Sequence, residues 1–594
     1  MSAHPSCTRG RGGRLYNPRP VRPVRALRQV ALARPGVSAI VSIGIAWGLF
    51  MHAMGWAQSS YYAQVRALAS GTSQLDPWQW QAKDEAWVDG HFYSVKAPGL
   101  AALTLPPYLV LDAVNAQSVA RQAAHSAHAT AHDHWHSHAP PRYFGYDAQR
   151  ARRVQTQVAQ NTPMVWALTL FGAVLPAIAL LFLVRWAAER VEPGFGTAAA
   201  VTLGLGTIVM TFGAEYFSHV ASAALGFGAF ALLMREREGP QRIRLVALAG
   251  LLAGLAVCFE YPLALLGVVL FGYALARPGR VRRGAAFAGA TAAGAAPALL
   301  YNLWSLGSPL RFAYSYAVAV PGRSGHAELG LNSAGFFGIT APRPGAAVDL
   351  LLSGRGLLTL TPVLVMGVAG AVMMRKRGHR AEAAVIVAVT AAYFLYNAGY
   401  WQPLGGGTPG PRFLLPTLPF LALGLAPAYR RFPALTLGLA IPSALTMLAA
   451  SLTYPLLGDV GTGTWISWLA AGSLEHTLLT ALGVTNAWLA VVPVLAAVAA
   501  AIAFAARATP RLPLGSVAPA LYAVLAWGLV SIAGPTVAGD PITPLSHGAP
   551  ALILVAAAVT TSLAALFALR HGERHAEGAH GRIVVAEPGF ERSS

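Results

Sequence analysis

Long apolar runs separated by short polar segments dominate the chain, and this pattern predicts a polytopic membrane protein. A membrane-spanning helix needs about 17 to 25 mainly apolar residues. Two of the runs contain a carboxylate, at Glu215 and at Glu260, so each predicts a pair of helices. The predicted fold is all-α with about fourteen crossings. The runs lie at 37–57, 163–185, 197–234, 243–276, 284–304, 357–374, 381–400, 413–428, 433–455, 487–506, 516–534 and 549–569.

The composition supports a membrane protein and excludes several other classes. Charged residues make up 11% of the 594 residues, whereas soluble globular proteins have about 25%. The net charge of +20 comes from arginines clustered between apolar runs, which is the pattern of cytoplasmic loops, so membrane lipids and no nucleic acid are the expected partners. Two cysteines, Cys7 and Cys258, indicate neither a disulfide framework nor a thiolate metal site.

The segment 98–115 decides on which side of the membrane the loops lie. It is apolar enough to span, yet it carries Pro106, Pro107 and Asp112. If it does not cross, the later arginine clusters fall on the side of the Arg-rich N-terminus, as the positive-inside rule requires. We therefore expect an interfacial or re-entrant helix on the outer face. The clusters lie at 185–190, 235–244, 277–283, 375–380, 430–431, 507–511 and 570–574.

This topology predicts a membrane core between two cytoplasmic tails. The apolar run after residue 36 lacks a convincing small-residue cleavage site, so we expect an uncleaved first helix. The first extracytoplasmic loop, 58–162, shares its surface with the loops 305–356 and 401–412, and the site is expected there. The predicted parts are a basic tail, 1–36; a membrane core, 37–430; C-terminal transmembrane helices, 431–570; and a cytoplasmic tail, 571–594.

The first outer loop combines carboxylates, a lysine and aromatic residues. Asp76, Asp84 and Asp89 precede Lys96, with Tyr93 among them. One interpretation is an interfacial belt, in which aromatic rings lie at headgroup depth and the charges are only solvated. The functional interpretation is a carboxylate that acts as general base on a hydroxyl group while a cation holds an anionic leaving group.

Further charged residues are predicted on the same outer surface. Arg412 follows a glycine-rich turn at the mouth of a helix and is suited to bind phosphate. Like Arg355, it departs from the positive-inside trend, and a side chain that snorkels at a helix end is the alternative for Arg412. Glu215, His219 and Glu260 lie at short outer turns. Carboxylates near membrane depth indicate a site, although capping of the next helix would also explain them.

A histidine-rich tract occupies 125–138 and includes His132, His134, His136 and His138. Such a tract can bind Zn²⁺ or Ni²⁺. Its Ala/Ser-rich context is also typical of a low-complexity insertion. No cofactor is assigned, and a divalent metal is left open.

Four stretches carry a resemblance to a known family. They are Asp-Gly-His-Phe-Tyr-Ser-Val-Lys-Ala-Pro-Gly at 89–99, Gly-Phe-Phe-Gly-Ile-Thr at 335–340, Ser-Gly-Arg-Gly at 353–356 and Gly-Pro-Arg-Phe-Leu-Leu-Pro at 410–416. The first, within 61–108, resembles the first outer loop of bacterial GT-C glycosyltransferases, a set that includes glycosyltransferase family 39 and the protein O-mannosyltransferases. The others are similar to stretches of uncharacterised bacterial members.

The resemblance implies an enzyme of the bacterial cytoplasmic membrane, with its site on the extracytoplasmic face. It would be a hexosyl- or pentosyltransferase that moves a sugar, with inversion, from a polyprenyl-phosphate donor to an acceptor hydroxyl on a lipid, glycan or protein. Carried onto this chain, the base would be Asp76, Asp84 or Asp89, and Lys96, Arg412 and Arg355 would hold the donor phosphate. Glu215, His219, Glu260 and Tyr93 would position the acceptor or line the site. The mannosyltransferases carry an Asp-Glu pair soon after the first helix, whereas no acidic residue precedes Asp76 here, so the base stays open.

Two other functions compete with a transferase. A transporter or lipid flippase predicts ionisable residues near helix midpoints and discontinuous paired helices, whereas the charges here lie mostly at helix ends. A non-enzymatic scaffold would leave the acidic loop free to vary in charge.

Overall fold

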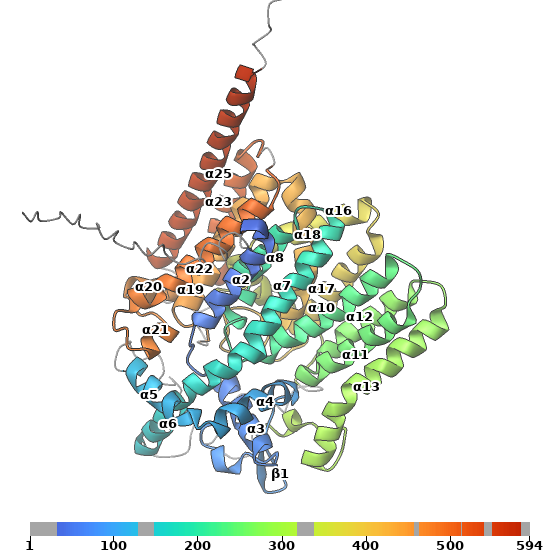
Figure 1. The fold of residues 1–594 in the computed structure, drawn as a ribbon, viewed down its shortest axis with the longest axis vertical. Coiled ribbons are helices and arrows are strands. Elements are labelled where there is room, and N and C mark those ends of the chain that lie inside the picture. Colours follow the sequence, from blue (N-terminus) through green and yellow to red (C-terminus); the bar gives the residue numbers. More distant parts are fainter. Residues whose placement is uncertain are drawn as a thin grey trace, which may run out of the picture.

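A computed structural model of the 594-residue chain describes residues 32–82, 84–128, 148–317, 338–456, 462–511, 514–539 and 549–583. Over these ranges the fold is all-α, as predicted, and the exception is one antiparallel hairpin (Figure 1). The strands are β1 (Glu85–Val88) and β2 (His91–Ser94). The largest cluster of buried apolar side chains includes Trp47, Phe230 and Phe420.

The helices occur along the chain in the following order. The first half of the chain contains α2 (Pro35–Leu49), α3 (Trp56–Ala69), α4 (Gly99–Ala113), α5 (Ala116–His128), α6 (Ala148–Thr169), α7 (Leu175–Val191), α8 (Gly196–Gly206), α9 (Val209–Phe212), α10 (Ser218–Arg237), α11 (Ile243–Phe259), α12 (Leu263–Leu275) and α13 (Arg280–Leu306). The second half contains α14 (Pro344–Leu352), α15 (Leu357–Leu360), α16 (Leu364–Lys376), α17 (Arg380–Gly399), α18 (Leu418–Arg431), α19 (Pro433–Leu452), α20 (Thr462–Ala470), α21 (Leu478–Ala481), α22 (Ala487–Ala508), α23 (Ala518–Val537) and α25 (Ala549–Ile583). Short 3₁₀ turns are η1 (Asp76–Trp78), η4 (Ala313–Tyr316) and η5 (Arg412–Thr417).

The predicted crossings correspond to helices of unequal length. Within the described ranges, nine helices are long and apolar enough to cross a membrane, or up to 11 if two bent pairs each count as one span. The other predicted crossings fall on the bent pair that ends in α16 and on four shorter apolar helices, α2, α8, α11 and α12. The 11 residues of α8 rise about 16 Å, well short of a hydrocarbon core of about 30 Å. The predicted count of about fourteen thus corresponds to nine long helices, one bent pair and four shorter apolar helices in the described ranges.

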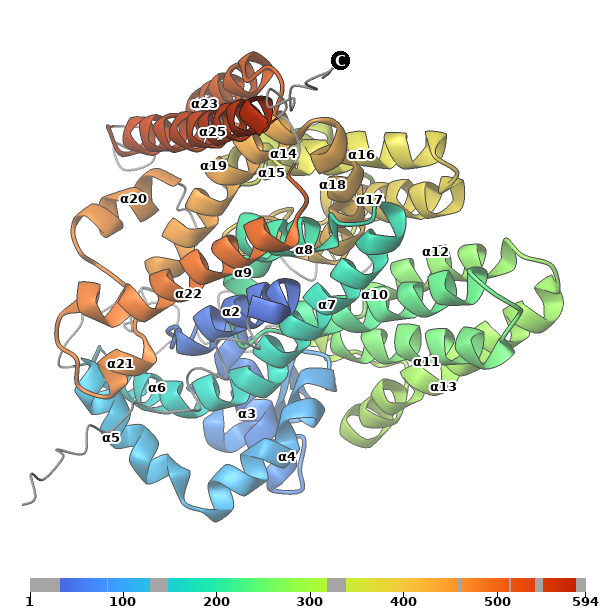
Figure 2. The same cartoon turned by 45° about the horizontal axis from the view of Figure 1, so that its top comes forward.

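The breaks inside the apolar runs lie where the carboxylates predicted them. Glu215 lies between α9 and α10, and Glu260 lies between α11 and α12. Helices α11, α12 and α13 pack against one another at one edge of the molecule (Figure 2).

The segment 98–115 does not form a straight span. Helix α4 has 15 residues and rises about 22 Å. It meets α5 at an angle of 92°, at Asn115, which has a positive φ of 52°. This bend agrees with the predicted interfacial or re-entrant helix.

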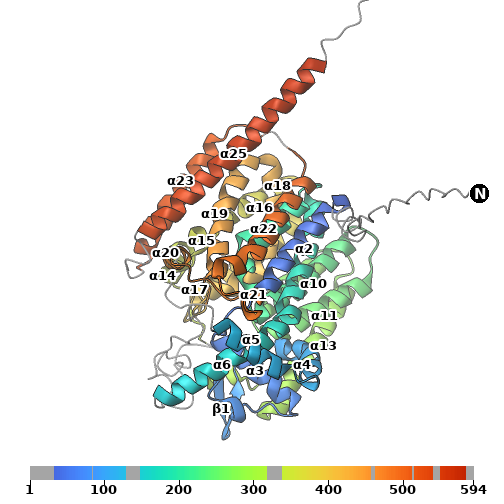
Figure 3. The same cartoon turned by 60° about the vertical axis from the view of Figure 1, so that its left-hand side comes forward.

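One predicted boundary is wrong, and one helix was not predicted. The first helix, expected over 37–57, ends at Leu49, and residues 51–55 are not helical. The chain then forms α3, in what was expected to be loop. The sequence of α3 is too polar for a span but carries Gln58, Tyr61 and Gln64 at spacings of three residues, which place them on one face. Figures 1 and 3 show α3, α4 and the hairpin at one end of the bundle, and α25 extending beyond the other.

Arginine clusters meet at the end of the bundle away from α3. The buried Glu192 pairs with both Arg377 and Arg430, and Glu236 lies 2.6 Å from Arg283. The 20 residues of α10 separate its two ends by about 30 Å. Clusters far apart in sequence therefore share one end, as the charge pattern predicted.

Helices α16 and α18 approach closely through glycines. A Cβ atom at Gly370 would overlap the carbonyl oxygen of Gly424, and one at Gly424 would overlap the carbonyl oxygen of Gly367. Small residues allow such approach between membrane helices, where dispersion contacts replace the hydrophobic effect.

We predict that Gly370→Ala destabilises the protein, because the added methyl group forces α16 away from α18. Overpacking of this kind costs about 1–3 kcal/mol and should lower the thermal midpoint of the purified protein in detergent. Gly289→Ala in α13 is the control, since a Cβ atom there meets nothing within 4 Å. Equal midpoints for the two variants would contradict this account of the packing.

Candidate functional site

The site is built on the hairpin, whose turn fixes its register. Asp89 and Gly90 form the turn, with positive φ values of 51° and 90°, the conformation that two-residue hairpin turns require and that Asp-Gly adopts readily. Glu85 then faces Ser94. The neighbouring residues are Asp84 before β1 and, after β2, Val95, whose N–H donates to the Asp84 carbonyl at 3.3 Å.

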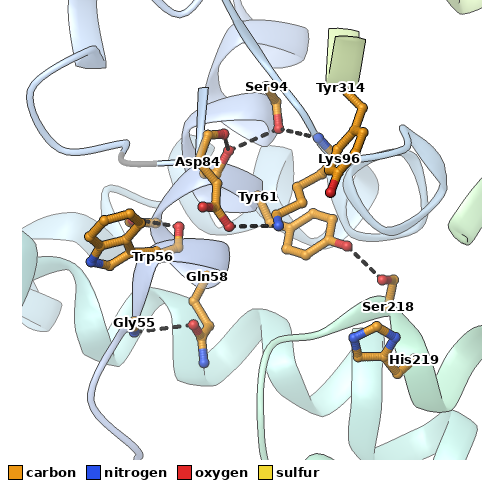
Figure 4. Close-up of polar contacts among 12 residues, drawn as sticks. Gly55, Trp56, Gln58, Tyr61, Asp84, Ser94, Lys96, Ser218, His219 and Tyr314 are labelled. Carbon is orange, nitrogen blue, oxygen red and sulfur yellow. Dashed lines mark hydrogen bonds and ion pairs between the residues drawn. The ribbon is translucent and has the colours of Figure 1, made fainter. Parts of the chain in front are cut away.

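This register brings Asp84 and Lys96 together. Lys96 Nζ lies 2.6 Å from Asp84 Oδ2, and the two side chains are only 16% and 10% exposed. Figure 4 shows the pair with Tyr61 and Tyr314 beside it. The attraction between two charges this close offsets part of the cost of burying them.

Two serines fasten the ion pair to α3. Ser60 Oγ donates to the Asp84 carbonyl at 2.5 Å and lies 2.9 Å from Ser94 Oγ. Ser94 Oγ accepts from the Lys96 backbone N–H at 3.1 Å. The position of Asp84 is therefore set by both the hairpin and the unpredicted helix.

The other two aspartates predicted as bases lie elsewhere. Asp76 accepts from the Phe92 N–H at 2.9 Å and lies 2.8 Å from His91 Nδ1, so its carboxylate holds the hairpin. Asp89 is 72% exposed and pairs with Arg311 at 2.7 Å. The hydrogen bond from Arg311 lowers the pKa of Asp89. Of the three, Asp84 alone is buried beside a lysine.

A second carboxylate, Glu260, faces the same region. Ser218 Oγ donates to Glu260 Oε1 and lies 2.5 Å from the hydroxyl of Tyr61. His219 Nδ1 lies 3.2 Å from the same oxygen. Burial raises the pKa of Glu260, while Ser218, Arg412 and Lys96 favour its ionised form. Because both Lys96 and Arg412 act on Glu260, the structure brings these predicted residues together.

Arg412 begins η5, where the glycine-rich turn ends. Its guanidinium lies 5.0 Å from the ring centre of Phe413 and 5.6 Å from that of Phe217. Its Nε atom is buried without a hydrogen-bond partner. A planar guanidinium held by rings, with a donor unused, suits an oxyanion.

Arg355 supports the loop that leads to Arg412. Its Nη1 atom donates to the carbonyls of Gly406, at 2.5 Å, and Thr408, at 3.1 Å. Gly405 has a φ of +80°, and a Cβ atom there would lie 2.8 Å from the Arg412 side chain. Arg355 thus organises the turn, a structural role that the sequence did not suggest.

Aromatic side chains surround Arg412. Phe413 makes edge contacts with His219 and Tyr400, at centroid distances of 5.7 and 5.2 Å. The hydroxyl groups of Tyr314 and Tyr400 are hydrogen-bonded. Tyr93, predicted to line the site, is buried in an apolar cluster with Val95 and Leu306.

Glu215 belongs to a separate buried cluster. Its carboxylate lies 3.1 Å from His52 Nδ1 and accepts from Gln58 Nε2 at 2.8 Å. Glu475 acts electrostatically on the same histidine. The carboxylates of Glu215 and Glu260 contact other side chains, and the N-cap residues of the helices that follow, Phe217 and Pro262, make no side-chain capping bond.

Sequence reasoning missed the partners of these carboxylates. Gln58 and Tyr61 lie three residues apart on α3 and bond the Glu215 and Ser218 groups respectively. Their helical spacing was the available signal. His52 and Glu475 lie more than 400 residues apart, and no pattern in the sequence links them.

No described group of three or more His, Cys, Asp or Glu residues could hold a metal ion. The four histidines His132, His134, His136 and His138 lie outside the described ranges.

Comparison with known proteins gives structural similarities only. No protein-family model and no curated protein matches the sequence. Two crystal structures of ArnT from Cupriavidus metallidurans are similar. The apo form has 13% identity and a TM-score of 0.43, covering 82% of this chain and 76% of that one. The form bound to undecaprenyl phosphate has 14% identity and a TM-score of 0.44, covering 88% and 82%.

The apo structure of the Archaeoglobus fulgidus oligosaccharyltransferase is also similar. It has 11% identity and a TM-score of 0.40 over 86% of this chain and 60% of that one. None of these similarities assigns a role to a residue of this chain.

We predict that stability falls as the pH rises toward 9, through His52 and Glu475. Burial disfavours the imidazolium, but Glu215, Glu475 and the Ser451 carbonyl together outweigh this effect and raise the pKa of His52 to about 9. Burial raises the pKa of Glu475 to about 8. A folded-state pKa above the unfolded value contributes stability that is present at low pH and lost as the pH rises through the folded value, on the order of 3 kcal/mol for His52.

The measurement is the thermal midpoint from pH 5 to 10. Glu475→Gln should reduce the fall of the thermal midpoint up to about pH 8. His52→Gln should reduce this fall up to about pH 9. Each variant removes one titrating group. His91→Gln is the control, since His91 is 45% exposed and pairs with Asp76. If both buried variants keep the slope of the unmodified protein, these groups do not control it.

Proposed function

We propose that the protein is a membrane glycosyltransferase that moves a sugar from a polyprenyl-phosphate donor to an acceptor hydroxyl, with Asp84 as general base. The observation that supports this most is the buried Asp84–Lys96 ion pair, together with Arg412, which acts with Lys96 on Glu260. Transfer from a phosphate requires a base and cations within one site, and these residues supply both.

The ion pair suggests how donor binding prepares the base. Lys96 neutralises Asp84, with Nζ 2.6 Å from Oδ2. A donor phosphate would attract Lys96 and the unpartnered Nε of Arg412, since charge-assisted bonds to phosphate are strong. Asp84 would then lose part of its counter-charge and become a better proton acceptor.

The reaction then balances through these residues. Asp84 accepts the proton of the acceptor hydroxyl, whose oxygen attacks the anomeric carbon from the face opposite the phosphate. The bond between that carbon and the phosphate oxygen breaks, and its electron pair stays on the polyprenyl phosphate. Lys96 and Arg412 stabilise the leaving charge. The anomeric configuration inverts.

Other residues would orient the acceptor. Glu260, with Ser218 and His219 around its carboxylate, offers hydrogen-bonding groups for an acceptor hydroxyl. Arg355 would act indirectly, through the loop that carries Arg412. Since the Arg-rich ends of the helices lie away from the site, we propose an extracytoplasmic site in a bacterial cytoplasmic membrane, within the core 37–430.

We predict that Asp84→Asn lowers sugar transfer by at least about 100-fold, the lower end of what a general base contributes. The amide keeps the shape of the side chain but cannot accept the proton. Purified protein would receive labelled polyprenyl-phosphate sugars and membrane extracts as the acceptor source. Asp89→Asn is the matched control on the exposed hairpin tip and should keep most activity. Full activity of Asp84→Asn would contradict the proposed base, and lipid uptake by proteoliposomes without any transfer would favour a transporter.

We further predict that Lys96→Met weakens binding of polyprenyl phosphate by about 10- to 100-fold, because hydrogen bonds to a charged group contribute about 1.5–3 kcal/mol. Direct binding of the lipid to the purified protein measures this. Lys96→Arg should restore part of the affinity by restoring the charge. Lys376→Met, at the Arg-rich end of α16, should bind normally. Equal affinities for Lys96→Met and Lys376→Met would remove Lys96 from the phosphate site.

A further inference from the structure

A second polar cluster lies along a neighbouring face of α3. Tyr61 and Tyr62 are adjacent residues, yet the hydroxyl of Tyr61 bonds Ser218 whereas that of Tyr62 donates to Gln117 on α5, at 3.3 Å. Successive helical residues project about 100° apart, so α3 separates two polar groups of residues. We call the second group, Tyr62, Arg66, Trp78, Gln81, Gln117 and Asn161, the Arg66 cluster.

Arg66 is a largely buried cation at the centre of this cluster. Its guanidinium lies 4.3 Å from the ring centre of Tyr62 and 5.0 Å from that of Trp78. Its Nη2 atom donates to Gln81 Oε1 at 2.9 Å, and its Nε atom is buried without a hydrogen-bond partner. The two rings therefore hold the guanidinium plane while a donor on its edge is unused.

No described carboxylate neutralises Arg66. Among the described residues, no Asp or Glu oxygen lies within 4.0 Å of it, and burial lowers its pKa. Asp112 and Arg121, both exposed, act on the Tyr62 hydroxyl with opposite signs. A largely buried cation without a carboxylate partner is costly. Arg283, by contrast, is paired with Glu236 at 2.6 Å.

Amide side chains extend from Arg66 toward the surface. Gln81 Oε1 also accepts from Asn161 Nδ2 at 3.2 Å, and Gln117 Nε2 donates to Asn161 Oδ1 at 3.1 Å. Gln81 Nε2 donates to Gln157, an exposed residue of α6, at 3.3 Å. Amides offer both donors and acceptors, which match hydroxyl groups, and aromatic rings flank the same cluster.

We propose that the Arg66 cluster binds an oxyanion, phosphate or carboxylate, carried on a hydroxylated molecule such as a sugar. The oxyanion would take the unused guanidinium donors, as Arg binds phosphate and carboxylate in a fork. The amides would bind neighbouring hydroxyl groups. Binding would supply the counter-charge that the described residues do not.

The Arg66 cluster lies next to the candidate site, so we assign the bound oxyanion to the acceptor of the sugar. Helix α3 carries Ser60, which donates to the Asp84 carbonyl, and also Tyr62 and Arg66 of the Arg66 cluster. As the place of the acceptor's charged group, the cluster rests on the transferase activity proposed above. As a binding site for an oxyanion it does not, and binding can be measured without turnover.

The test measures thermal stabilisation of the full-length protein in detergent at constant ionic strength. The probes are glucuronate and glucose 6-phosphate, with glucose and inorganic phosphate for comparison. We expect saturable stabilisation by at least one charged sugar, at concentrations where glucose and phosphate have little effect. Arg66→Gln should abolish it. Arg311→Gln, which removes a half-buried arginine paired with Asp89, should keep it.

A second variant guards against misfolding of Arg66→Gln. Gln81→Glu places a carboxylate where Arg66 already donates, 2.9 Å away, so it should raise the midpoint of the ligand-free protein and abolish stabilisation by the charged sugar. Lys96→Met should still respond, which distinguishes this site from the donor phosphate site. The proposal is wrong if no charged sugar stabilises the protein, if glucose acts equally well, or if Gln81→Glu responds as before. If the unmodified protein binds a charged sugar but transfers no sugar from the donor, the proposed function is wrong and the binding site at Arg66 stands.

Discussion

The ion pair between Asp84 and Lys96 is the interaction on which the rest of the candidate site depends. Burial of either charge alone would be costly, so the two residues must meet. They meet because the Asp89-Gly90 turn fixes the hairpin register. A slip of one residue would turn every strand side chain to the other face and separate them. A local turn preference thereby determines where a base and a phosphate-binding cation stand.

Helix α3 connects this pair to the remainder of the molecule. Ser60 fastens the hairpin, Gln58 bonds Glu215 and Tyr61 approaches Glu260 through Ser218. Through Glu215 and His52 the helix also joins Glu475, which lies in the C-terminal part of the chain. A neighbouring face of α3 carries Tyr62 and Arg66. One short polar helix outside the predicted spans thus carries groups that belong to three buried polar clusters.

Sequence patterns located the site region better than the roles within it. Hydrophobic runs and arginine clusters predicted the helices, the breaks at Glu215 and Glu260, and the shared Arg-rich end. The same patterns could not separate Asp76, Asp84 and Asp89, because burial decides between them and burial depends on contacts with α3. Nor could they show that Arg355 binds loop carbonyls, since an arginine in a loop has the same sequence signature in either role.

The sequence by itself determined what depends on neighbouring residues: an all-α membrane fold, the places of most membrane helices, and a charged first outer loop. These follow from hydropathy over about 20 residues and from the distribution of charge between the apolar runs. Only the tertiary structure decided which charges are paired, because Lys96 and Arg412, or His52 and Glu475, come together through packing across hundreds of residues. Long-range contacts of this kind leave no periodic trace in one sequence, and they determine which carboxylate is buried beside a cation.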